Sequence, residues 1–398
     1  MGGLLAGCAT GPGPSGPSNR PRSPVTQTPT QSPSPSAGPV GWSLARLASQ
    51  VLVVPAPAED VSAVSAEVQL GVGGIILYGS NGPSNLAQQL ADLEALAPAG
   101  EVLTVMTDEE GGAVQRLSNL VGPLPSARQM AATMSPQQIR QLGLSTGERL
   151  RSAGVTVDLA PVLDLDGGTG PSATDPDGTR SFSTSASTAA ADGIAFAKGL
   201  IAAGVTPVVK HFPGLGSSAG NTDSAPATTL PYAQLKTAGL LPFAWAVSQG
   251  LPAVMVANAS VPGLTNRPAS ISSAVIQGVL RQQLHFQGLV MTDSLSAGAL
   301  SGAGYSVPQA AVAALRAGAD LLLFNATSAQ LSTVTAATIA AIVAAVQAGS
   351  LPRSELVAAV AQVLTFKSLS QPQPATAGAR GTQLRLDGLE PRVGAGHS

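Results

Sequence analysis

Polar residues that could do chemistry recur along this sequence, and each follows directly on a short apolar run. They are Asp108 after VLTVMT, Asp164 after LAPVL, Lys210 and His211 after PVV, Asn258 after VMVA, and Asp293 after GLVMT. Any one of them could be a helix N-cap or a hydrogen-bonded strand end, but their repetition favours a shared site. Carboxylate, amide and ammonium groups suit a ligand rich in hydroxyls, because each hydroxyl both donates and accepts hydrogen bonds. The set lacks the clustered His, Cys and carboxylate ligands of a metal centre, so no metal is predicted.

The densest polar segment is VVKHFPGLGSSAGNTDSA, which spans residues 208–225. Lys210 and His211 stand at the end of its apolar run, and a loop of Gly, Ser and Asn then leads to Asp223. Charged residues at the carboxyl end of a buried strand, followed by a flexible loop, indicate a functional site rather than core packing.

The elements that must position these residues alternate between short β-rich runs and Ala- and Leu-rich helical stretches. Candidate strands are 51–54, 74–78, 102–107, 156–162, 207–211, 253–257, 288–292 and 320–324, and helical segments include 135–153, 186–203, 271–284 and 308–317. Eight such units in about 330 residues predict an α/β fold, a (β/α)8 TIM-like barrel formed by a single domain. The alternative is an open doubly wound sheet, but no Gly-x-Gly-x-x-Gly phosphate loop follows the first candidate strand.

Composition argues against several other classes of function. The 398 residues are 44% hydrophobic and 11% charged, with a formal net charge of -2, which gives no basis for binding nucleic acid or for a basic membrane patch. No run of about 20 apolar residues stands out as a membrane span. The single cysteine, Cys8, excludes an internal disulfide.

The N-terminal end differs in composition from the middle of the chain. The run LAGC, residues 5–8, resembles a bacterial lipobox, in which the cysteine thiol is acylated and becomes the new N-terminus. Seven residues cannot hold both the basic and the apolar region of a signal peptide, so we expect the true start codon to lie upstream. The expected location is the outer face of the cytoplasmic membrane in a bacterial cell envelope, with the lipid on Cys8 as the membrane contact.

These composition shifts divide the chain into four predicted parts. Residues 1–8 are a signal-peptide remnant with its lipobox, and residues 9–41 are a disordered Pro/Ser/Gly-rich tether that cannot offset its ordering entropy by burial. Residues 42–370 form the barrel, and residues 371–398 are a disordered tail.

Six motifs in order resemble those of family 3 glycoside hydrolases, most closely the single-domain β-N-acetylhexosaminidase branch. They are MTDEEGGAVQRL (106–117), VDLAPVLDLD (157–166), TRSFS (179–183), VVKHFPGLG (208–216), PASIS (268–272) and GLVMTDSLSAGAL (288–300). The resemblance implies a retaining hydrolase of β-linked N-acetylhexosaminides. The location suggests sugars derived from the cell wall. No cofactor is implied, because carboxylates do the chemistry. We expect a monomer whose partner is its carbohydrate substrate.

The resemblance also implies roles for individual residues. The nucleophile of the family falls on Asp293, and its ligand for sugar hydroxyls falls on Asp108. Further matches to the sugar subsite are Arg116, Arg180, Lys210 and His211, and Asn258 stands where the family usually has a histidine after the sixth strand. For Arg116 and Arg180 the alternative is a buried ion pair that holds the loops. For His211 we favour sugar contact over proton transfer.

One departure from the family pattern bears on activity. The loop that follows Lys-His-Phe-Pro-Gly ends in the family with Asp-Ser-His, whose His is the general acid/base, but here it reads Asp223-Ser224-Ala225. Losing such assistance costs about 10²–10⁴-fold in rate. Three hypotheses follow: a glycosidase in which Asp223 is the acid, its pKa raised by burial or a neighbouring carboxylate; a lipid-anchored carbohydrate-binding pseudoenzyme; or a scaffold that presents a surface to a partner.

Overall fold

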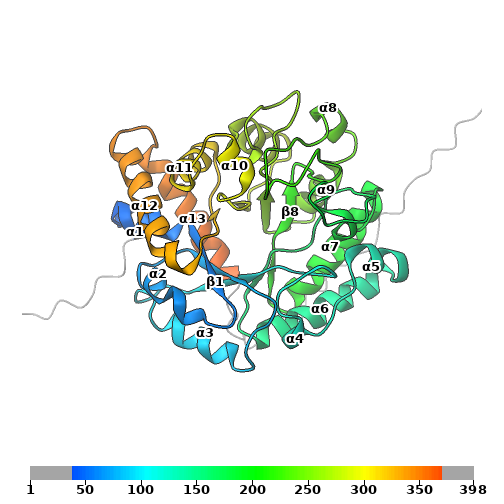
Figure 1. Ribbon diagram of the computed structural model, residues 1–398, viewed down its shortest axis with the longest axis horizontal. Helices are drawn as coiled ribbons and strands as arrows, with labels where there is room; N and C mark the ends of the chain where they lie inside the picture. Colours follow the sequence, from blue (N-terminus) through cyan, green and yellow to red (C-terminus); the bar gives the residue numbers. More distant parts are fainter. Residues whose placement is uncertain (1–37, 370–398) are drawn as a thin grey trace, which may run out of the picture. The chain divides into compact units, whose positions relative to one another are not determined.

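The computed structural model describes residues 38–369, which form a closed ring of parallel strands surrounded by helices (Figure 1). The predicted lipobox, nearly all of the predicted tether and the predicted tail lie outside the described residues. The strands are β1 (Leu52–Pro57), β2 (Gly74–Tyr78), β3 (Thr104–Thr107), β6 (Val157–Asp158), β7 (Thr206–Pro207), β8 (Val209–Phe212), β9 (Ala253–Val256), β10 (Leu289–Thr292) and β11 (Leu322–Leu323).

Strand pairing follows the order of the chain and returns to its start. The parallel neighbours are β1 with β2, β2 with β3, β3 with β6, and β6 with β7. Strand β7 continues through Val208 into β8, which pairs with β9, and β9 pairs with β10. A bridge between Met291 and Leu321 joins β10 to the strand that contains β11, and β11 pairs with β1. The eight predicted strands and the (β/α)8 barrel are therefore confirmed.

The barrel interior is packed with apolar side chains that alternate along each strand, as expected for strands buried on both faces. They include Val53, Ile76, Met106, Leu159, Met255, Met291 and Leu323. Val363 and Phe366 of α13 (Arg353–Leu369) belong to the same cluster. Phe366 also lines a hollow with Pro252 and Gly288, which precede β9 and β10, so α13 covers the amino ends of the strands. The carboxyl ends remain available for a site.

Helices cover the outside of the barrel (Figure 1). The longer ones are α1 (Leu44–Gln50), α3 (Leu86–Glu94), α6 (Pro136–Ser152), α7 (Ala186–Ala202), α9 (Leu241–Ser248), α11 (Val307–Ala317), α12 (Ser328–Gln347) and α13. Short elements are α2 (Ser65–Gln69), α4 (Ser118–Val121), α5 (Ala127–Thr133), α8 (Tyr232–Leu235), α10 (Gly298–Gly302), the hairpin β4 (Glu109–Gly111) and β5 (Val114–Gln115), and the 3-10 turns η1 (Pro39–Gly41), η2 (Val61–Val64), η3 (Gly178–Arg180) and η4 (Ala269–Ile271). The predicted helix at 271–284 is instead the end of η4 followed by a π-helix, η5 (Ala274–Gln283).

Two of the predicted helices, α6 and α7, show how local sequence sets these elements. Helix α6 begins after Ser135, whose hydroxyl caps the backbone N–H of Gln138, with Pro136 in the first turn. It packs against α7 at glycines, and a Cβ on Gly199 would collide with the carbonyl oxygen of Arg140. The close approach of the two helices therefore requires glycine at that position.

Within residues 38–369, α12 is the one helix long and apolar enough to cross a membrane. The mean hydropathy of its most apolar 18 residues is 1.8, and 28% of those residues are buried. Its buried residues are Leu331, Thr335, Thr338, Ile342 and Ala345, spaced three and four apart as on one helix face. Core helices of soluble proteins pass the same test, so this helix is weak evidence for a membrane span. It nevertheless differs from the expectation that no such segment exists.

Candidate functional site

A cavity of about 260 Å³ lies at the carboxyl ends of the strands. Its floor is formed by residues of the barrel interior, including Ile76, Leu159, Met255 and Leu323. Its walls contain seven of the predicted site residues, namely Asp108, Arg116, Arg180, Lys210, His211, Asp223 and Asp293. The structure thus brings together side chains separated by up to 185 positions in the sequence (293 − 108 = 185). Among the described residues, those that line the hollow beside Phe366 include no Asp, Glu, Lys or Arg. The polar cavity is therefore the better candidate for the functional site.

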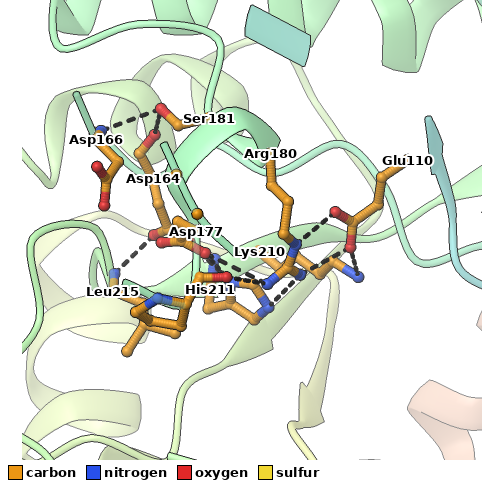
Figure 2. Close-up of polar contacts among 12 residues, drawn as sticks. Glu110, Asp164, Asp166, Asp177, Arg180, Ser181, Lys210, His211 and Leu215 are labelled. Atoms are coloured by element: carbon orange, nitrogen blue, oxygen red, sulfur yellow. Dashed lines mark hydrogen bonds and ion pairs between the residues drawn. The ribbon is translucent and has the colours of Figure 1, made fainter. Parts of the chain in front are cut away.

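Two cations and two carboxylates form one ion-pair network in the wall of this cavity. Figure 2 shows the part of it in which Lys210 and Arg180 contact Glu110. Lys210 Nζ lies 2.6 Å from Asp108 Oδ1 and 2.6 Å from Glu110 Oε1. Arg180 holds the other side of Glu110 with its Nε at 2.7 Å from Oε2 and its Nη2 at 2.8 Å from Oε1. Burial of Glu110 opposes ionisation, but the charges of Arg180 and Lys210 hold the pKa of this carboxyl well below its usual range. Bidentate contact of this kind fixes both side chains in place.

Replacing Lys210 by methionine should lower the free energy of unfolding by about 3–5 kcal/mol, because it leaves Asp108 and Glu110 without a shared cation. Lys210 itself is 2% exposed. Chemical unfolding at neutral pH measures the change. Lys198→Met is the control, since Lys198 donates to Gln249 at the surface and should change stability by about 0.5 kcal/mol or less. A loss for Lys210→Met no larger than that of the control would contradict the prediction.

His211 is held in one orientation by Asp164, which follows β6. The ring Nδ1 lies 2.7 Å from Asp164 Oδ2, and the main-chain N–H of His211 donates to the same oxygen at 2.9 Å. The other oxygen, Oδ1, accepts from the Leu215 N–H at 2.7 Å. Burial, followed by the charge of Arg180, lowers the pKa of His211, so the ring is neutral near pH 7. The Asp164 contact assigns the ring proton to Nδ1, which leaves Nε2 as an acceptor beside Arg180.

Asp293 follows β10 and lines the cavity, and its side chain is half-buried. Its Oδ1 accepts a hydrogen bond from the Ser294 N–H at 2.6 Å. Burial raises the pKa of Asp293 above its usual value, and the nearby Asp223 carboxylate adds to the rise. These two carboxyl groups therefore share one cavity and interact electrostatically.

The loop that contains Asp223 is fastened to the segment that follows Asp293. The N–H groups of Gly298 and Ala299 donate to the carbonyl oxygens of Asp223 and Thr222, each at 2.9 Å. A side chain on Gly298 would collide with the Ser224 carbonyl oxygen, so glycine is needed for this contact. Asp223 is exposed, so the first of the two alternatives given for it, burial, is wrong; the second, a neighbouring carboxylate, has a candidate in Asp293 of the same cavity.

Asn258 does not line the cavity, contrary to the expectation that it contacts a ligand. It is 1% exposed, with its Nδ2 donating to the Ser294 carbonyl oxygen at 2.7 Å and its Oδ1 accepting from Ser270 Oγ at 2.6 Å. Both ends of the amide are thus used inside the protein. Asn258 fixes the backbone of Ser294, directly after Asp293, and sequence position alone could not reveal that orientation.

Several lining residues were missed by sequence reasoning. They are Glu110, Val114, Pro171, Pro176, Asn221, Ser294 and Asn325. Glu110 had a usable signal, because it follows Asp108 by two positions and residues two apart along an extended segment face the same side. Pro171 and Asn221 had none. They meet through the loops after β6 and β8, where the Asn221 N–H donates to the Ala173 carbonyl oxygen at 3.1 Å.

Comparison with known proteins shows that this chain is similar to glycosyl hydrolases. Residues 47–366 match the glycosyl hydrolase family 3 N-terminal domain. The Beta-hexosaminidase LpqI of Mycobacterium tuberculosis is 35% identical over 382 residues, which cover 92% of this chain and 94% of that protein. An uncharacterized secreted glycosyl hydrolase of Arthroderma benhamiae is 34% identical over 75% of this chain and 85% of its own length. The crystal structure of a Beta-N-acetylhexosaminidase from Beutenbergia cavernae superimposes with a TM-score of 0.74 at 30% identity, covering 82% of this chain and 99% of that one.

Proposed function

The chain belongs to glycosyl hydrolase family 3, and from that premise we propose that it releases terminal β-linked N-acetylhexosamine residues with retention of configuration. One observation supports this proposal above the others. Asp293 and Asp223 share a cavity with the ion-pair network of Asp108, Glu110, Lys210 and Arg180. Two of the similar proteins named above, the LpqI protein and the Beutenbergia cavernae enzyme, are a beta-hexosaminidase and a beta-N-acetylhexosaminidase by name.

The cavity suits one sugar residue. Its volume of about 260 Å³ lies just below the range of about 300–1,000 Å³ that is usual for pockets that bind drug-sized ligands, so there is no room for a longer oligosaccharide inside it. Asp108 is 18% exposed while Lys210 is almost fully buried, so Asp108 presents an acceptor oxygen to a hydroxyl and Lys210 holds that carboxylate. His211 Nε2 offers a second acceptor.

We assign the chemistry to two carboxyl groups. Asp293 attacks the anomeric carbon as the bond to the leaving oxygen breaks, and a glycosyl ester on Asp293 forms. Asp223 gives its proton to the leaving oxygen as it departs. A water molecule then attacks the same carbon and returns its proton to Asp223, which releases the sugar and restores both carboxyl groups. Exposure of Asp223 keeps it accessible to an incoming water molecule.

A binding protein without turnover is the second candidate, and two observations favour it. Ala225 cannot transfer a proton, and Asp223 is exposed rather than enclosed in an apolar pocket that would hold its proton. The test is a panel of nitrophenyl glycosides that differ in the sugar. We expect release of nitrophenol from the N-acetyl-β-glucosaminide in preference to the β-glucoside, with retained configuration by proton NMR. No turnover on any member, together with a rise in Tm on adding N-acetylglucosamine, would establish the binding protein instead.

We also propose that Cys8 is acylated and that the protein acts outside the cytoplasm. The LAGC run at residues 5–8 supports acylation, and the secreted relative supports the location. Metabolic labelling with an alkyne fatty acid should mark the wild type and not Cys8→Ala. A label that persists in the variant would reject Cys8 as the attachment point.

A further inference from the structure

A carboxyl group without a hydrogen-bond donor lies beside Arg180 and His211, two residues that line the cavity. Asp177 immediately precedes the turn η3 that contains Arg180, and its side chain is fully buried. Across residues 38–369, neither of its carboxyl oxygens finds a hydrogen-bond partner. Arg180 Nη1 lies 3.5 Å and His211 Nδ1 lies 3.8 Å from Asp177 Oδ1. Both are engaged elsewhere, Nη1 with the Pro176 carbonyl oxygen at 3.0 Å and Nδ1 with Asp164.

The neighbouring Asp164 carboxyl has the opposite surroundings. Its two oxygens receive three N–H donors, two from His211 and one from Leu215. Oxygens of Asp164 and Asp177 and a ring nitrogen of His211 all lie within 4.8 Å of one another. Figure 2 shows these three side chains gathered in one place. Hydrogen-bond donors stabilise an ionised carboxylate, whereas burial without donors penalises it. Asp164 is therefore the anion of the pair, and Asp177 is the group on which a proton is retained.

The charges around the pair lead to the same assignment. The positive charges of Arg180 and Lys210 are already matched by those of Glu110 and Asp108. The His211 ring is neutral, so it adds no positive charge. An ionised Asp164 then leaves one excess negative charge, and a second one on its buried neighbour would have no cation to offset it.

The titratable groups that face Asp177 come from four segments. They are Asp164 after β6, His211 on β8, Glu110 on β4 and Arg180 on η3. Burial and the Asp164 charge raise the pKa of Asp177 to about 8, and burial raises the pKa of Asp164 to about 7. Groups this close titrate as a unit, so the pair holds at least one proton at pH 7.

We propose that Asp177 is a positioning residue that is a neutral acid in the folded protein and donates its proton to Asp164. That hydrogen bond adds to those that hold Asp164, which in turn orients the His211 ring toward the cavity. A neutral Asp177 also leaves the Arg180 guanidinium to Glu110, whereas an ionised Asp177 would compete for it. The consequence for sugar binding rests on the proposed function, but the protonation state does not.

The proton makes stability depend on pH with a definite sign. The folded pKa of the pair is raised above the unfolded value of about 4, so its stabilisation is complete below that value and is lost as the pH rises toward about 8. Between these limits, unfolding of the wild type releases a proton that unfolding of Asp177→Asn does not. The unfolding equilibrium constant of the wild type should therefore rise up to about tenfold more per pH unit than that of Asp177→Asn.

Urea titrations at several pH values between about 5 and 7 measure this difference. Asp166→Asn is the matched control, because Asp166 is a neighbouring buried aspartate whose carboxylate accepts the N–H groups of Gly168 and Ser217. Because Asp166→Asn retains Asp177, its pH slope should stay steeper than that of Asp177→Asn. Asp177→Ala is a second variant that cannot ionise, for use where Asp177→Asn does not fold. Equal slopes in the wild type and in either Asp177 variant would overturn the proposal.

A divalent cation is the other way to satisfy two buried carboxyl groups beside a histidine. Wild-type protein treated with a chelator should show no rise in Tm on adding zinc. A rise that Asp177→Asn lacks would also overturn the proposal. Where turnover is measurable, the KM of the wild type should increase above about pH 8 and that of Asp177→Asn should not. Because unfolding and zinc binding need no turnover, an inactive protein would refute the hydrolase proposal and leave this one standing.

Discussion

Asp293→Asn is expected to lower kcat on nitrophenyl N-acetylglucosaminide by about 10⁴-fold or more, because an amide cannot form the glycosyl ester. The variant keeps the size of the side chain, so the cavity and the ion-pair network should stay intact. A coupled release assay at saturating substrate measures kcat. Binding should survive, with N-acetylglucosamine still raising the Tm of the variant.

The control is Asp60→Asn, which removes an exposed carboxylate that does not line the cavity and should leave kcat within error of the wild type. Incubation with a 2-fluoro sugar that stalls the second step should leave a covalent adduct on Asp293 in the wild type, visible by mass spectrometry. An adduct on another residue, or kcat for Asp293→Asn within tenfold of the wild type, would remove Asp293 from the nucleophile role.

Asp223→Ala is expected to lower kcat/KM by about 10²–10⁴-fold on chito-oligosaccharides and far less on nitrophenyl glycosides. The physical reason is the leaving group, since a sugar alkoxide needs a proton as it departs while a nitrophenolate does not. The ratio between the two substrate classes is the measurement. An equal loss on both would show that the Asp223 side chain supports the structure of its loop and is not the proton donor.

Ala225→His is expected to raise activity, the opposite of the effect expected for Asp223→Ala. Ala225 is exposed, so an imidazole fits without displacing the core. A histidine here, two positions after Asp223, would supply a proton donor with a pKa close to neutral, and we expect up to about 10²-fold higher activity on chito-oligosaccharides. The gain should shrink when Asp223 is also replaced, because the imidazole then lacks its carboxylate partner.

Local sequence was sufficient for the barrel strands and for most of the Asp, Glu, Arg, Lys and His residues that line the cavity. A strand is marked by its own apolar run, and Asp108, Lys210 and Asp293 were placed correctly because the carboxyl ends of parallel barrel strands must meet at one face. Helix α6 was equally clear from Ser135 and Pro136. The π-helix η5 was not, because nothing in its sequence separates that geometry from an ordinary helix.

Only the tertiary structure decided what each polar side chain does. Lys210 and Asp108 are 102 positions apart, and their 2.6 Å contact exists only once β3 and β8 are part of the same barrel. Asn258 and Asp293 both follow barrel strands, yet one is enclosed by Ser270 and Ser294 and the other faces the cavity. Asp177 had no sequence signal at all.

The residue types and their order along the strands determined the fold and the location of the site, because those follow from periodicity and from strand topology, and the six ordered motifs indicated the family. Burial and the number of hydrogen-bond donors around each carboxyl group decided the rest. Asp164 and Asp177 are the same residue type, but one receives three N–H donors and the other receives none within the part of the chain that the structure describes. A charge or a proton on a carboxyl group depends on its neighbours in space, and those neighbours come from distant parts of the chain.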